Sequence, residues 1–89
     1  MDILRRFAGS ATECPHVPQS VPEPQAVRCQ ECGSGFNLRL CANCGHVGCC
    51  ESQRGHSRAH ALGERHPVIY QMPAPNGFIW CYEERTYVG

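Results

Sequence analysis

Several short apolar segments, one of which alternates with polar residues, predict strands along the chain. Residues 36–40 alternate well enough for a short strand that runs into Cys41. Residues 67–70, 78–82 and 86–88 have the composition of three further strands, of which the last two are joined by a short polar turn. These segments predict a short, mostly antiparallel sheet.

A single segment, residues 52–62, has the composition of a helix. Ser52 is the candidate N-cap, and Gly63 is the expected end of the helix. His56 and His60 are four residues apart, so a helix would place both imidazoles on one face.

The remaining segments predict connections. Residues 17–26 contain three prolines and indicate an extended link, and residues 73–77 form a turn-rich loop. Gly45 and Gly48 are expected to flank a turn. We expect residues 1–13 to be a flexible N-terminus and residues 14–89 to form one α+β domain, in which one main helix packs on the sheet.

Cysteine and histidine set the chemistry of this domain. The 89 residues include eight cysteines and five histidines but few aromatic residues, so the apolar core is small. Zinc commonly replaces the missing core in chains of this size. We therefore expect a zinc-stabilised domain whose metal-free form is largely unfolded.

Charge and composition exclude several classes of protein. Eight arginines balance eight acidic residues and are scattered along the chain, which argues against a nucleic-acid-binding module. No segment approaches a membrane span. Residues 1–8 carry two arginines but are followed by no apolar signal region, so we expect a cytoplasmic protein. In a reducing compartment the cysteines favour metal binding over the alternative, a disulfide scaffold.

The spacing of the cysteines matches zinc knuckles. Cys29-x-x-Cys32 and Cys41-x-x-Cys44 are two such knuckles, and each needs two ligands from elsewhere in the chain. Spacing alone permits two pairings. In a helix-face pairing, one site consists of Cys41, Cys44, His56 and His60. In an interleaved pairing, one site has Cys29, Cys32, Cys49 and His56, and the other has Cys41, Cys44, His60 and His66.

From Cys14 to Val88 the chain resembles the ubiquitin-specific-protease-type zinc finger, the ZnF-UBP domain. The shared pattern comprises Cys14-Pro-His16, the two knuckles with Gly45, Cys49, Gly55-His56, His60, His66-Pro67-Val68, Trp80-Cys81-Tyr82 and Tyr87-Val88. Members of this family have cross-braced zinc sites, so the resemblance implies the interleaved pairing. Because no protease or deacetylase sequence is attached, we expect a stand-alone member of the kind that bacteria encode.

The resemblance also implies a third zinc site. Members with three zinc ions close this site with a Cys-x-His pair and a C-terminal C-x-x-C. This chain supplies Cys14, His16 and Cys81, and it has Glu84 at the fourth position. A glutamate oxygen can ligate zinc, so the site is either Cys-His-Cys-Glu or a vestige with a solvated Glu84. Cys50 and His46 are left over, as a free thiol and a turn residue.

Eukaryotic members bind the free Gly-Gly tail of ubiquitin in an aromatic pocket with an arginine. Trp80, Tyr82 and Tyr87 occupy the positions of the pocket aromatics, although strand residues of this kind also serve as core. Glu51-Ser52 replace the Arg-Tyr pair of the family, and Glu51 would repel a carboxylate. Arg39, which replaces a tryptophan, can supply positive charge from the other wall.

The sequence therefore predicts a monomeric, non-enzymatic zinc-binding module that contacts a protein or a peptide C-terminus. An enzyme would need an open metal site, for which only the Cys14/His16/Cys81 group is a candidate, with Glu84 as a base. The alternative function is thiol or metal sensing through Cys50 and a labile third zinc ion.

Overall fold

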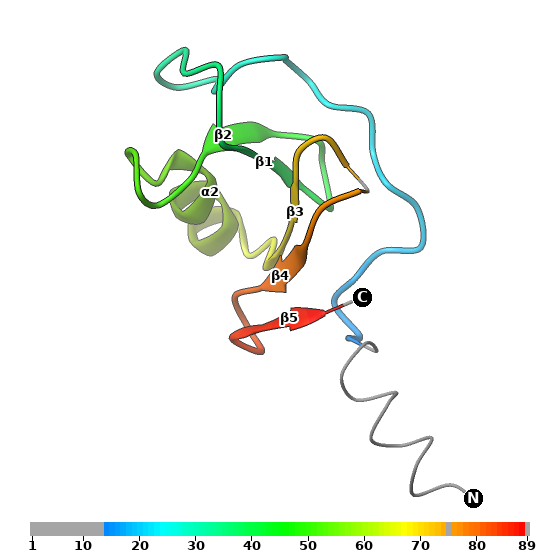
Figure 1. The fold of residues 1–89 in the computed structure, drawn as a ribbon. Coiled ribbons are helices and arrows are strands. Elements are labelled where there is room, and N and C mark those ends of the chain that lie inside the picture. The colour runs from blue at the N-terminus through cyan, green and yellow to red at the C-terminus, as the bar shows by residue number, and fades with distance from the viewer. Residues whose placement is uncertain (1–13, 75, 89) are drawn as a thin grey trace, which may run out of the picture.

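A computed structural model of the protein describes residues 14–74 and 76–88. Five strands and one helix follow one another in these residues (Figure 1): β1 (Leu38–Cys41), β2 (Val47–Cys49), α2 (His56–Glu64), β3 (Val68–Gln71), β4 (Ile79–Cys81) and β5 (Thr86–Val88). The expected flexible N-terminus, residues 1–13, lies outside the described residues. The structure thus has the expected α+β architecture, with one helix and one sheet.

The five strands form a single sheet in the order β2-β1-β3-β4-β5, in which every neighbouring pair is antiparallel. Leu40 of β1 pairs with Val47 of β2 on one side and with Tyr70 of β3 on the other. Because paired residues share a face, these three side chains form one apolar surface. All three are buried in the core.

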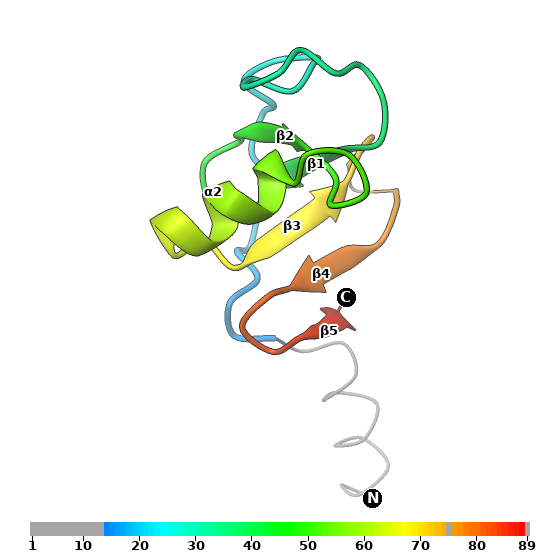
Figure 2. The same cartoon turned by 90° about the vertical axis from the view of Figure 1, so that its left-hand side faces the viewer.

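The two faces of the sheet are covered by different parts of the chain. α2 packs over β2, β1 and β3 on one face (Figure 2). The N-terminal connection runs along the other face, where Cys14 and Val17 pack against the core. Helix α2 contacts neither β4 nor β5, and the pocket described below is lined by residues of and beside these two strands.

β2 is a strand that sequence reasoning missed, because Gly48 was expected to flank a turn. Gly48 instead pairs with Arg39 in the middle of the ladder. A Cβ atom at this position would lie 2.6 Å from the backbone nitrogen of Ser57. Gly48 is therefore required by the close approach of α2 to the sheet.

The expected helix, residues 52–62, is shifted in the structure. Residues 51–54 form turns, and the helix begins at His56 after an N-cap at Gly55, whose φ of 67° is left-handed. Ser52 is not the N-cap, because its hydroxyl contacts the Cys50 thiol instead. The helix also continues through Gly63 to Glu64, and Arg65 ends it in a left-handed conformation.

The strand bounds differ from the predictions by one or two residues. β1 begins at Leu38 because Asn37 has a φ of 51°, which interrupts an extended backbone. β3 and β4 cover the predicted segments with their ends moved by one residue, and β5 has the predicted bounds. Residues 17–26 contain neither helix nor strand, as the prolines predicted. Within the described residues, no helix is long and apolar enough to cross a membrane.

Candidate functional site

The first metal-ligand cluster joins the first knuckle, the end of β2 and the start of α2. The Nδ1 atom of His56 lies 3.4 Å from the sulfur of Cys29 and 3.4 Å from that of Cys49. The sulfurs of Cys32 and Cys49 are 3.9 Å apart. All four ligand atoms lie within 4.8 Å of one another. This cluster offers three sulfurs and one imidazole nitrogen to a single ion.

The second cluster joins the second knuckle to the middle of α2 and the residue pair after it. Cys41 Sγ lies 3.4 Å from His66 Nδ1, and Cys44 Sγ lies 3.3 Å from His60 Nε2. The knuckle is closed by a hydrogen bond from the Gly45 N–H to the carbonyl of Cys41, 3.0 Å long. These four ligand atoms also lie within 4.8 Å of one another.

The interleaved pairing is therefore the one that the structure forms, and the helix-face pairing is wrong. His56 and His60 share one helix face, but His56 contacts the first cluster and His60 contacts the second. Each cluster draws two cysteines from one knuckle and its remaining ligands from distant segments. Both clusters consequently tie the knuckles to the sheet and the helix.

The donor sets and their spacing fit zinc. Tetrahedral zinc bonds of roughly 2.0–2.3 Å place neighbouring ligand atoms about 3.3–3.8 Å apart. Five of the ligand pairs in the two clusters are separated by 3.3 to 3.9 Å, and no pair exceeds 4.8 Å. All eight cysteines are free thiols, so no disulfide competes for these ligands. The two clusters are thus zinc sites, and each offers four protein ligands to one ion.

A third group links the N-terminal connection to β4. His16 Nδ1 lies 3.5 Å from Cys14 Sγ and 3.6 Å from Cys81 Sγ, and the three atoms form a compact set. The carboxylate of Glu84 reaches His16 at 3.6 Å but does not join the set of mutually close atoms. The Glu84 N–H donates to the Cys81 sulfur at 3.3 Å.

Two further residues of the ligand-rich segment stay outside these groups. Cys50 is 7% exposed, and its sulfur lies 3.0 Å from the hydroxyl of Ser52. This hydrogen bond is the main reason why the pKa of the Cys50 thiol lies below its ordinary value. His46 is equally buried and contacts both a knuckle residue and a zinc ligand.

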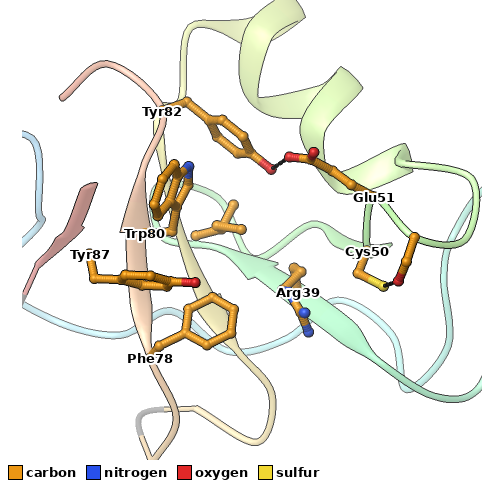
Figure 3. Close-up of a pocket in the computed structure, with 9 residues that line it drawn as sticks. Arg39, Cys50, Glu51, Phe78, Trp80, Tyr82 and Tyr87 are labelled. Atoms are coloured by element: carbon orange, nitrogen blue, oxygen red, sulfur yellow. Dashed lines mark hydrogen bonds between the residues drawn. The ribbon is translucent and has the colours of Figure 1, made fainter. Parts of the chain in front are cut away.

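A surface pocket of about 350 Å³ lies beside α2, on the open part of the sheet (Figure 3). Its lining consists of Arg39, Cys50, Glu51, Ser52, Ile69, Phe78, Trp80, Tyr82 and Tyr87. The four residues predicted to bind a peptide are all among them. Sequence reasoning missed Phe78 and Ile69. The alternation of strand residues would have found Phe78, which is two residues before Trp80 and therefore on the same side.

The aromatic wall of the pocket follows from strand register. Trp80 pairs with Tyr87 across β4 and β5, and their rings meet edge to face with centroids 4.9 Å apart. Phe78 continues the wall at 5.2 Å from Tyr87. The guanidinium carbon of Arg39 lies 4.9 Å from the centroid of Phe78, so a positive charge borders the aromatic surface.

Glu51 lies at the end of the pocket where Tyr82 forms the wall, away from Phe78 (Figure 3). Its Oε2 atom accepts a hydrogen bond from the Tyr82 hydroxyl at 3.0 Å and lies 3.9 Å from Nε of Arg58. Burial, together with this hydrogen bond and the charge of Glu51, raises the pKa of Tyr82 well above its ordinary value. The Glu51 carboxylate at one end of the pocket is thus held by Tyr82 and Arg58. The Arg39 guanidinium at the other end lies over the ring of Phe78.

Comparisons with known proteins agree with this geometry. Residues 29–89 match the family described as a zinc finger in ubiquitin hydrolases and other proteins. BRCA1-associated protein from human is 37% identical over 68 residues, which cover 75% of this chain and 11% of that protein. Ubiquitin carboxyl-terminal hydrolase 44 from Ailuropoda melanoleuca is 26% identical over 83 residues, or 85% of this chain and 11% of that protein.

A bacterial structure has a similar fold. The solution structure of protein RPA1320 from Rhodopseudomonas palustris superposes with a TM-score of 0.72 and is 37% identical. The match covers 84% of this chain and 79% of that one. The curated relatives are far longer, since this chain spans only 11% of the length of BRCA1-associated protein.

Proposed function

This chain belongs to the family of zinc fingers found in ubiquitin hydrolases and other proteins, and from that membership we propose that it is a monomeric protein-binding module of the cytoplasm. Its ligand is the C-terminal tail of a protein or peptide. The tail enters the pocket beside α2, its apolar atoms contact Trp80, Tyr82 and Tyr87, and its terminal carboxylate meets Arg39.

The observation that carries this proposal is the combination of an aromatic wall and a bordering guanidinium in one pocket. Small-ligand sites are mostly apolar with a few convergent polar groups. The pocket of about 350 Å³ meets this description, because aromatic and aliphatic side chains line it and Arg39 lies at its edge. A guanidinium is well suited to bind a carboxylate with two parallel hydrogen bonds.

Glu51 makes ubiquitin a poor ligand in this proposal. Glu51 and Ser52 stand where the resembled family has Arg and Tyr, and both line the pocket. Tyr82 and Arg58 hold the Glu51 carboxylate in place, so it opposes the approach of a second carboxylate from that side. We therefore propose that the tail approaches from the Arg39 side and belongs to a partner other than ubiquitin.

The metal centres have a structural role in this proposal. Two of them have four protein ligands each and leave no open position for a reactive water. We propose that the third group also holds zinc, through Cys14, His16 and Cys81, with Glu84 as the fourth ligand. Catalysis is not part of the proposed function. Sensing through Cys50 has less support, because that thiol is 7% exposed.

Fluorescence of Trp80 tests the proposal directly, because it is the only tryptophan in the chain and it lines the pocket. The zinc-loaded protein would be titrated with a pool of random hexapeptides that have free C-termini and with the same pool amidated. We expect a saturable change with the free pool only. Arg39→Ala should weaken binding by roughly 10- to 100-fold, the effect of losing a charged hydrogen bond. Arg54→Ala, an exposed arginine outside the pocket, is the matched control. Equal responses to both pools would contradict recognition of a carboxylate.

A further inference from the structure

His46 is a buried histidine that neither zinc site uses. It lies between the second knuckle and β2 and is 7% exposed. Its ring stacks on the ring of His60, with centroids 3.9 Å apart and planes inclined by 4°. His60 also meets the ring of His66 edge to face at 5.6 Å. The ring of His60, a ligand of the second zinc site, is therefore contacted on one face by His46. It also lies next to His66, the other imidazole ligand of that site.

The opposite side of His46 contacts the first knuckle. Its Nε2 atom donates a hydrogen bond to the carboxylate of Glu31, with a separation of 2.7 Å. Glu31 lies inside the first knuckle, between Cys29 and Cys32. Two hydrogen bonds between Gln30 and Val47 also hold this knuckle against β2. The Gln30 N–H donates to the carbonyl of Val47 at 2.9 Å, and the Val47 N–H donates to the Gln30 side chain at 2.8 Å.

We infer that His46 is a positioning residue that couples the two zinc sites. It touches the loop that carries two ligands of the first site and the ring of one ligand of the second. Groups that contact a metal ligand from outside fix its orientation and strengthen metal binding. Through His46, a disturbance of the first knuckle changes how His60 is held, so the two ions are retained as one unit. This inference goes beyond peptide binding and does not depend on it.

The coupling predicts a long-range effect of Glu31. Among the described residues, the Glu31 side chain makes hydrogen bonds to Cys29 and His46 and none to a ligand of the second site. Glu31→Ala nevertheless should weaken metal binding at the second site by roughly 10-fold, the lower end of the losses in affinity seen when an outer contact of a metal ligand is removed. At an unchanged rate of metal association, release from this site becomes faster by the same factor. The same substitution in a His46→Phe background should have no additional effect on the second site, because the hydrogen bond is already absent.

Cadmium-113 NMR of the full chain loaded with cadmium tests this inference. The first site has three sulfurs and the second has two, so their resonances are distinct, and the decay of each during treatment with EDTA gives its release rate. In the wild-type background, Glu31→Ala should shift the resonance of the second site and hasten its decay. Glu23→Ala, which removes another exposed carboxylate, should change neither resonance.

The phenylalanine variant keeps an aromatic ring against His60 and so separates loss of the hydrogen bond from loss of packing. If His46→Phe does not fold, His46→Gln breaks the other contact, because it keeps a donor for Glu31 but has no ring against His60. In that background Glu31→Ala should again have no additional effect on the second site. Two results would overturn the inference. One is an effect of Glu31→Ala that is confined to the first site. The other is an effect of Glu31→Ala on the second site that is equally large with and without His46, as expected for independent residues.

Discussion

The Tyr82 hydroxyl and the Glu51 carboxylate form a 3.0 Å hydrogen bond that joins the turn after β4 to the turn after β2. These two turns are 31 positions apart in the chain. The bond closes one end of the pocket and holds Glu51 at the position for which the resemblance implied an arginine. In the proposed function, this one contact bears on both the integrity of the pocket wall and the choice of ligand.

Tyr82→Phe should lower the free energy of unfolding of the zinc-loaded protein by about 0.5–1 kcal/mol, because it removes one partly exposed hydrogen bond. The effect should depend on pH. The pKa of Tyr82 is raised in the folded state, so the stability it contributes is present below the ordinary pKa of 10.0 and declines as the pH rises above it. Urea unfolding of the wild type and of Tyr82→Phe at pH about 8 and about 11 measures how the difference in their free energies of unfolding changes with pH. A difference between wild type and variant that does not narrow at the higher pH would contradict the assignment.

Two glycines should respond oppositely to alanine. A Cβ atom at Gly48 would lie 2.6 Å from the nitrogen and 2.8 Å from the Cα of Ser57, so α2 would have to move. We expect Gly48→Ala to destabilise the protein by about 1–3 kcal/mol. Gly63 lies in the same helix and has no atom within 4 Å of its added methyl group. Gly63→Ala should stabilise by about 0.5–1 kcal/mol. Thermal unfolding of both variants checks the pair.

The accessibility of a cysteine does not indicate whether it binds zinc here. Cys32 is exposed but belongs to the first site, whereas Cys50 is buried and belongs to none. Native mass spectrometry should show that Cys32→Ser retains one zinc ion fewer than the wild type. Cys50→Ser should keep the full number. A loss of zinc from Cys50→Ser would assign that thiol as a ligand and contradict the proposed ligand set.

The third metal site can be tested with two adjacent glutamates. Glu84 lies 3.6 Å from His16 Nδ1, and its neighbour Glu83 is exposed. If Glu84 completes the site, the wild type carries three zinc ions, and Glu84→Ala loses one of them while Glu83→Ala keeps all three. Zinc content per chain distinguishes the variants. Two ions in the wild type would show that the Cys14, His16 and Cys81 group does not hold zinc.

Ligand spacing predicted more of this structure than apolar periodicity did. The two knuckles, Cys49 and the three later histidines are recognisable as ligands from their residue types and from the C-x-x-C spacing of each knuckle. The spacing does not show which ligands share a site, because His56 and His60 lie on one helix face and satisfy either pairing. The observed partition depends on how the helix crosses the sheet, which is a tertiary property.

The missed elements have a common physical cause. β2 contains Gly48, which favours a turn by its intrinsic preference but is needed where α2 approaches the sheet. The helix begins after Gly55 rather than at Ser52, because the hydroxyl of Ser52 is used by Cys50. In both cases a contact with a distant or metal-binding segment overrides the local preference. Arg39, Trp80, Tyr82 and Tyr87 of the pocket were predictable from the resemblance. The buried position of His46, by contrast, depends on contacts that the sequence does not reveal.

The most direct test of the interleaved zinc architecture is a correlation spectrum between protein protons and cadmium-113 bound in place of zinc. One metal resonance should correlate with Cys29, Cys32, Cys49 and His56, and another with Cys41, Cys44, His60 and His66. Addition of EDTA should abolish these two resonances, together with that of the proposed third site, and unfold the chain, because binding of the metal stabilises the fold. A single resonance that correlates with Cys41, Cys44, His56 and His60 would contradict the account.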